Sequence, residues 1–179
     1  MKSQKLPIHR IQSQLLREEG GRILLPLRQL LRNLEASIGN TLFTELVTCQ
    51  PGQDIDDPLC GGKYACAWFI SNQLTLVGLW KGPPQTWVKY MPRDLKKAGW
   101  QQKCVTSLDI GDVVIYNFHD GNEHIAIYVG DGMAISTTRE NHQDKDSLRS
   151  PQKHPFLYEG RNDGPRTIKS VWYHPLLFG

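Results

Sequence analysis

The chain changes character near Trp100, and this change most constrains its fold. Before it, apolar residues recur at helical spacing; after it, short segments rich in β-branched and aromatic residues are separated by turn residues. The predicted helices are 8–19, 23–38 and 65–77, and the predicted strands are 112–118, 124–129, 133–137 and 167–173. Helices followed by strands are typical of an α+β fold, in which helices pack on an antiparallel sheet.

Glycine and proline residues indicate where the helices begin and end. The Gly-Gly pair at 20–21 separates the first two helices. Pro26 fits only in the first turn of the second helix, which Gly39 then ends. The segment 65–77 is apolar nearly all round and contains no proline, so it predicts a largely buried helix.

Three further segments carry turn or capping signals. Residues 48–62 contain two prolines, paired aspartates and three glycines, which predicts a long loop. A short helix is expected over 92–97, with Gly99 as its stop. Gly130, Asp131 and Gly132 predict a tight hairpin between two strands.

Composition places the chain among globular proteins. Its 179 residues are 39% hydrophobic and 22% charged, and we assign 23–179 to one domain preceded by a helical extension at 1–22. A net charge of +3 without a long basic block argues against nucleic acid as a partner. No apolar run reaches the roughly 18 residues that a membrane span needs. Nothing in the sequence indicates an oligomeric state.

The N-terminus and the cysteines bear on the cellular compartment. The first residues include lysines but no apolar signal core, so we expect cytoplasmic synthesis and, for an exported protein, a route other than general secretion. No CxxC pair is present, which disfavours zinc-ribbon and thioredoxin-like readings. A Cys49–Cys60 disulfide is conceivable across the loop, but a reducing cytoplasm favours free thiols.

Cys66 opens the predicted buried helix, and it is either a packed core thiol or a nucleophile. The helix dipole and amide groups without intrahelical partners favour a thiolate at this position. A cysteine and a histidine brought together by the fold are the minimum apparatus for thiol acyl transfer, which needs no cofactor or metal. The question is therefore which histidine is the partner.

Of the six histidines, His124 is the favoured partner. It begins an alternating strand in which it shares a face with Ala126, whose small side chain leaves room for the helix carrying Cys66 to pack there. His119, in the preceding turn, is the rival. A metal site from His119, Asp120 and His124 would have three ligands in one short turn without further support, which is a weak signal.

The sequence resembles the NlpC-like and CHAP-type cysteine amidohydrolases and peptidases of the papain-like group. The matching features occur in family order over roughly residues 30–137: LEASIGNTLF, YACAWFISNQLTLVGL, LDIGDVVIY and EHIAIYVGDGMAIST, with a looser match at VWYHP. The resemblance implies a papain-like fold in which the nucleophile helix packs on the antiparallel sheet. It also implies that Cys66 is the nucleophile and His124 the general base.

The same resemblance assigns a third position and a substrate cleft. The group that orients the imidazole falls at Ser136, or at Thr137 with a one-residue slip, where family members usually carry His, Asn, Asp, Glu or Gln. Many NlpC-like members have Asp-Cys-Ser-Gly around the nucleophile, whereas this chain has Ala65, Cys66, Ala67 and Trp68, so the substrate cleft is expected to be bulkier and less polar. Tyr64 is a candidate substrate contact or second oxyanion donor, with packing as the alternative.

Three functions follow in order of preference. The first is a cysteine peptidase or amidase that cleaves peptidoglycan, and the second is a thiol protease or acyltransferase acting on another amide. The third is a catalytically silent binding module with the same fold. Residues 1–22 precede the matched region; they are a docking or export segment, a cover for the cleft, or simply a packed helix.

Overall fold

A computed structural model describes residues 25–49, 54–117, 121–139, 149–157 and 167–178. The predicted helix 8–19, the proposed extension at 1–22 and the turn histidine His119 lie outside these ranges. Within them, helices are followed by an antiparallel sheet, so the predicted α+β class is confirmed.

The helices form close to where glycine and proline predicted them. Pro26 is the first residue of its helix, where a missing N–H costs nothing, and Gly99 ends another with a φ of 100°. The α-helices are α2 (Pro26–Ser37), α3 (Ala65–Leu76) and α4 (Met91–Ala98). Single 3₁₀ turns are η1 (Thr41–Phe43), η2 (Val88–Tyr90) and η3 (Pro175–Leu177).

The sheet has six antiparallel strands in the order β3-β8-β4-β5-β6-β7. They are β3 (Gln101–Lys103), β4 (Val113–Asn117), β5 (Glu123–Gly130), β6 (Met133–Arg139), β7 (Arg149–Pro155) and β8 (Thr167–Tyr173). Asp131 and Gly132 join β5 to β6 with φ values of 51° and 67°, which is the two-residue turn that matches strand twist. The predicted hairpin is confirmed.

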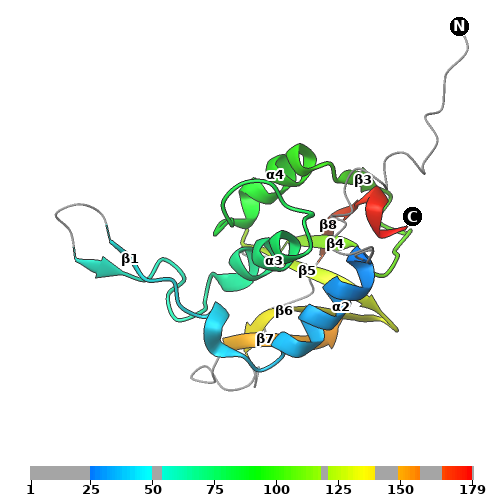
Figure 1. Ribbon diagram of the computed structural model, residues 1–179. Coiled ribbons are helices and arrows are strands. Elements are labelled where there is room, and N and C mark those ends of the chain that lie inside the picture. Colours follow the sequence, from blue (N-terminus) through cyan, green and yellow to red (C-terminus); the bar gives the residue numbers. More distant parts are fainter. Residues whose placement is uncertain (1–24, 50–53, 118–120, 140–148, 158–166, 179) are drawn as a thin grey trace, which may run out of the picture.

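The helices cover one face of the sheet, with α3 lying against β5 and β6 (Figure 1). Ile125, Ile127 and Ile135 point toward α3 and are fully buried with Phe69 and Ile70 of that helix. Alternate strand residues, together with Phe156 just after β7, form a second apolar cluster, which consists of Val114, Tyr116, Ala126, Ala134, Phe156 and Val171. Because both faces of the central strands are buried, β4 and β5 each contain a continuous apolar run, residues 113–116 and 125–129.

The LDIGD motif forms a turn that holds β4 against β5, with Gly111 and Asp112 buried and Asp109 and Ile110 exposed. Gly111 donates its N–H to the carbonyl of Tyr128 at 2.8 Å, and the Asp112 carboxylate accepts from the backbone N–H of Asp109 at 2.7 Å and from Lys103 at 2.6 Å. Burial raises the pKa of the Asp112 carboxyl, although the Asp109 amide and the Lys103 ammonium oppose the rise. The motif is therefore part of the scaffold.

Two strands of the sheet and one small hairpin were not predicted. The edge strand β7 contains Pro151 and Pro155 and few apolar residues, and β3 has three polar residues, so neither carries a strand pattern. The predicted loop 48–62 contains a small hairpin, β1 (Thr48–Cys49) paired with β2 (Ile55–Asp56), which projects from the body (Figure 1). Pairing with a neighbouring strand, rather than local preference, makes these segments extended.

Candidate active site

Cys66 is the second residue of α3, as the sequence predicted. Its side chain is 8% exposed and packs with Ala67, Phe69 and Ile70 in the core between α3 and the sheet. It lies in the first helical turn, where backbone N–H groups have no intrahelical acceptor. The thiol thus combines burial with the local backbone that favours an anion.

The loop before α3 is organised by Asp57, which sequence analysis did not single out. Its carboxylate accepts three backbone hydrogen bonds, from Leu46 and Leu59 at 3.0 Å and from Gly61 at 2.7 Å. Burial opposes ionisation of Asp57, but the three amides outweigh it and lower the pKa of the carboxyl. Asp57 therefore fixes the chain eight residues before Ala65, where α3 begins. The sequence signal that could have indicated this role is the position of Asp57 within a run of turn residues.

His124 is the second residue of β5 and is 7% exposed. Its ring lies 6.1 Å from that of Tyr116 on β4 and 6.2 Å from that of His154 on β7, measured between ring centroids. The ladder from β5 to β4 runs from Glu123 to Ile127. His124 is thus held at the start of a central strand beside two other ring systems.

The expectation that α3 packs over Ala126 is wrong. The alternation of β5 is as predicted, but Ala126 belongs to the second apolar cluster, while α3 packs on Ile125 and Ile127. Large β-branched side chains, not a small one, fill the space beneath the helix. The imidazole of His124 shares its face with Ala126 and is not directly beneath the middle of α3.

Ser136 is fully buried on β6, and its hydroxyl donates to the carbonyl of Ile125 at 2.5 Å. The β5–β6 ladder runs from Ile127 to Gly130, so this side chain bonds the β5 backbone just beyond the end of the ladder. The hydroxyl proton is therefore committed to the backbone. Its oxygen keeps a lone pair that can accept from an imidazole N–H. Thr137, the alternative, is also buried and alternates onto the Ile135 face that α3 covers.

His154 is a candidate that the sequence did not reveal. It is 2% exposed on β7, near the ring of His124, and its Nδ1 lies 3.0 Å from the carbonyl of Pro155. Because a carbonyl oxygen only accepts, Nδ1 carries the proton and Nε2 is the acceptor of this imidazole. The strand β7 was not predicted, so no spacing rule could place His154 beside His124.

The two predicted substrate contacts differ in exposure. Tyr64, immediately before α3, is 41% exposed and stacks on Trp87 with ring centroids 6.4 Å apart. Trp68 is half-buried one turn into the helix. An exposed aromatic pair therefore lies beside the first turn that holds Cys66.

The structure also bears on the metal site and the disulfide that the sequence left open. Among the described residues no three His, Cys, Asp or Glu side chains are grouped to hold a metal, and His119 and Asp120 lie outside those residues. Cys60 is a free thiol, so the Cys49–Cys60 disulfide is not formed. In the part of the chain that is described, no helix is both long and apolar enough to cross a bilayer.

A sequence model of the NlpC/P60 family matches residues 64–161, more than half of the chain. The chain belongs to the NlpC/P60 family. NlpC/P60 proteins are in general cysteine peptidases and amidases, and helices packed on a six-stranded antiparallel sheet agree with their papain-like fold. The NlpC/P60 match begins at Tyr64 and includes Cys66, His124, Ser136 and His154. No individual curated protein matches the chain.

Proposed function

We propose that the protein is a cysteine amide hydrolase that cleaves peptide bonds of peptidoglycan, with Cys66 as nucleophile and His124 as general base. The observation that carries the proposal is the position of Cys66 in the first turn of α3, inside the segment that matches a family of cysteine peptidases and amidases. Peptidoglycan is the substrate class that the family suggests.

The proposed reaction is a two-step acyl transfer. The Cys66 thiolate attacks the amide carbonyl carbon and forms a C–S bond, and the backbone N–H of Cys66 donates to the developing oxyanion. His124 protonates the leaving amine as the C–N bond breaks. Water, deprotonated by His124, then hydrolyses the thioester and restores the thiol.

In the proposed reaction, Cys66 and His124 approach each other at the end of the sheet. Since α3 packs on Ile125 and Ile127, the proposed approach of Cys66 to His124 is around the start of β5, beyond the β5–β6 ladder, rather than across Ala126. A third group then orients the imidazole of His124. The candidates are the lone pair of Ser136 and Nε2 of His154, and the second is the stronger acceptor because an imidazole nitrogen is more basic than a hydroxyl.

Thiol reactivity tests the pair directly. Iodoacetamide labelling resolved by peptide mass spectrometry across about pH 5–8 should modify Cys66 faster than Cys60, and His124→Ala should slow Cys66 about 10- to 100-fold. Cys104 is the stricter comparison for the labelling rate of Cys66. It is exposed, and its hydrogen bond with the Thr106 hydroxyl lowers the pKa of its thiol. His174→Asn, which removes another buried imidazole, should leave the rate unchanged.

Substrate is tested separately by incubating purified peptidoglycan with the wild type and with Cys66→Ala. Release of soluble fragments by the wild type alone supports the cell-wall assignment. A reactive Cys66 without release favours a thiol hydrolase or acyltransferase for another amide. A Cys66 no faster than Cys60, with no response to His124→Ala, contradicts the catalytic pair and favours a silent binding module.

A further inference from the structure

Three exposed aromatic side chains lie close together beside the start of α3. Tyr64, Trp87 and Tyr90 are 41%, 56% and 40% exposed. Tyr64 and Trp87 are nearly parallel, with 19° between their ring planes. Large exposed rings that gather in one place are a recognised mark of a binding surface. Because Tyr64 is two residues before Cys66, this surface is next to the candidate nucleophile.

Cationic side chains lie over these rings. The Lys63 ammonium is 5.1 Å from the Tyr64 ring centroid, and the Lys89 ammonium is 5.1 Å from that of Trp87 and 4.9 Å from that of Tyr90. Such contacts hold a flexible cation in place without neutralising it. Both lysines are exposed, and in the described part of the chain neither pairs with a carboxylate, so both charges are available to a ligand.

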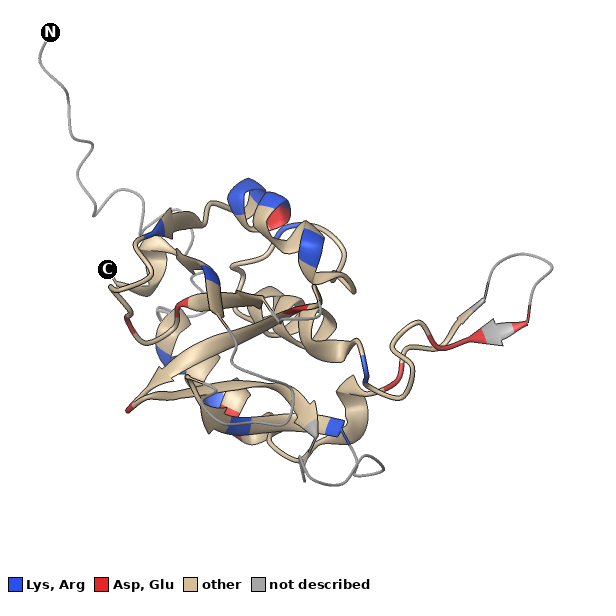
Figure 2. Cartoon of the chain, turned by 180° about the vertical axis from the view of Figure 1, so that it is seen from behind, with Lys and Arg blue, Asp and Glu red and all other residues tan. Residues whose placement is uncertain are grey.

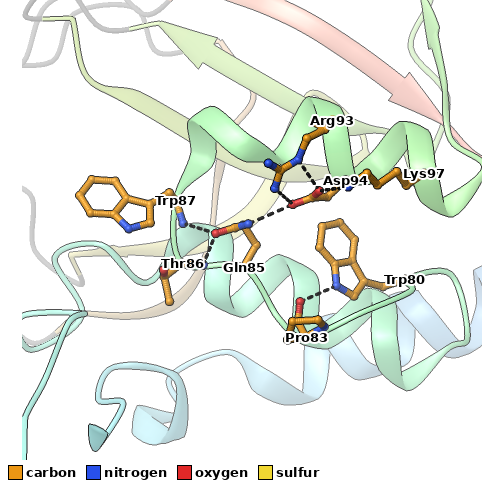
Figure 3. Close-up of polar contacts among 8 residues, drawn as sticks. All are labelled: Trp80, Pro83, Gln85, Thr86, Trp87, Arg93, Asp94 and Lys97. Carbon is orange, nitrogen blue, oxygen red and sulfur yellow. Dashed lines mark hydrogen bonds and ion pairs between the residues drawn. The ribbon is translucent and has the colours of Figure 1, made fainter. Parts of the chain in front are cut away.

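The surface is built on a fixed loop. Gln85 lies between Trp87 and Asp94 (Figure 3), accepts from the backbone N–H of Trp87 at 3.2 Å, and donates to the Asp94 carboxylate at 3.0 Å. The N–H of Gln85 donates to the hydroxyl of Ser71 in α3 at 2.8 Å. The loop that carries Trp87 is therefore bonded to both α3 and α4, so the rings are held before a ligand arrives.

The surrounding face carries more positive than negative charge, because α4 has Arg93, Lys96 and Lys97 against Asp94. Figure 2 shows Lys and Arg along α4, which continues the surface. Arg93 of this helix is next to the rings, with its guanidinium 5.1 Å from the Tyr90 ring centroid. Asp94 neutralises Arg93 through a 2.7 Å ion pair, which leaves Lys63 and Lys89 as the available charges. The 3₁₀ turn that contains Lys89 and Tyr90 also packs on β5, the strand of His124.

We infer that Tyr64, Trp87, Tyr90, Lys63 and Lys89, here called the aromatic-cationic surface, bind an acidic peptide chain. Its carboxylates pair with the two ammonium groups while its backbone lies along the exposed edges of the rings, whose faces are already in contact with the cations and with one another. That the surface binds an acidic peptide does not depend on the proposed function; that this peptide is the substrate does. A peptide is favoured over single-stranded nucleic acid, which also stacks on rings, because the enzyme family acts on amides and the net charge is only +3.

Binding is measured on the full chain carrying Cys66→Ala, so that the result does not depend on turnover. Fluorescence anisotropy with labelled hexaglutamate should show binding that weakens with salt, whereas hexaglutamine and hexalysine should not bind. Lys89→Gln and Trp87→Leu should each weaken hexaglutamate binding about tenfold. Lys153→Gln, at an exposed ion pair on β7, is the matched control and should have no effect.

A charge reversal at Lys89 tests the peptide-binding assignment independently of folding. Lys89→Glu should lose hexaglutamate and gain hexalysine, a reversal that general unfolding cannot produce. Equal hexaglutamate affinity in the wild type, Lys89→Gln and Trp87→Leu overturns the assignment, as does tighter binding of an oligothymidylate than of hexaglutamate. If hexaglutamate binds as expected but the wild type hydrolyses no amide, the binding role of the surface is supported and only the proposed catalysis is contradicted.

Discussion

At the scale of single residues, Ser136 and His154 show how neighbours determine what a polar side chain can do. The Ser136 hydroxyl donates to the backbone of β5, so it contributes a structural bond whatever else it accepts. His154 is buried near His124 with its Nδ1 committed to a carbonyl. Both are buried polar groups, but only His154 presents a basic nitrogen as its second atom.

If His154 Nε2 orients His124, the two amide replacements of His154 should differ. The side-chain oxygen of His154→Gln reaches the position of Nε2, whereas His154→Asn reaches only that of Nδ1. Cys66 alkylation should therefore be nearly normal in His154→Gln and about 10- to 100-fold slower in His154→Asn. Nitrogen NMR of the His124 ring should show an altered tautomer balance only in His154→Asn.

The opposite order would identify His154 as a structural residue that acts through its bond to Pro155. Ser136→Ala is the companion variant, and it should lower stability more than Cys66 reactivity. A large loss of reactivity in Ser136→Ala, with normal reactivity in His154→Asn, would return the orienting role to Ser136.

At the scale of elements, the helices and the four apolar strands follow local pattern, whereas β3 and β7 do not. A strand buried on both faces has a continuous apolar run that is visible in sequence, as in β4 and β5. The edge strand β7 has Pro151 and Pro155 and is extended because β6 pairs with it along seven positions. Because β7 was not predicted from the sequence, His154 could not be placed beside His124.

Gly111 tests whether the LDIGD turn is a structural element. Its φ is +99°, and an added Cβ would lie 2.8 Å from Leu27 of α2 and 3.1 Å from Leu177 of η3. Gly111→Ala should lower the free energy of unfolding by about 1–3 kcal/mol, since both the backbone conformation and the packing resist it. Urea unfolding followed by circular dichroism measures the change.

Gly82 provides the matched control, because its φ of +112° is similar and nothing lies within 4 Å of an added Cβ. Gly82→Ala should show the backbone cost alone and destabilise less than Gly111→Ala. Equal losses in the two variants would mean that the contact with α2 and η3 adds nothing.

At the scale of the whole molecule, His174 connects the C-terminal end of the chain to α4. Its Nδ1 accepts from the N–H of Leu176 at 3.2 Å, its Nε2 lies 3.3 Å from the carbonyl of Ala98, and its ring packs edge-on against Trp100. Both hydrogen bonds suit the neutral imidazole with the proton on Nε2. Burial lowers the pKa of His174, Lys81 adds to the effect, and the Ala98 carbonyl opposes it.

Global stability should therefore fall in acid through His174. Because the folded-state pKa lies below the unfolded value of about 6.5, the unfolded chain takes up the proton first, and stability present above pH 6.5 is lost as pH falls. His174→Asn keeps an acceptor for Leu176 and does not titrate. Between pH 7.5 and 5.5 the wild type should lose up to about 1.4 kcal/mol per pH unit relative to this variant. Parallel unfolding curves would contradict the role of His174.

The sequence by itself determined the α+β class, the helix that begins at Ala65 with Cys66 in its first turn, and the hairpin at Asp131 and Gly132. These depend on local rules: periodicity, caps and left-handed turn residues. Only the tertiary structure decided which face of β5 the helix covers, that His154 lies beside His124, and that Tyr64 and Trp87 stack. Such contacts join residues distant along the chain, and no local preference encodes them.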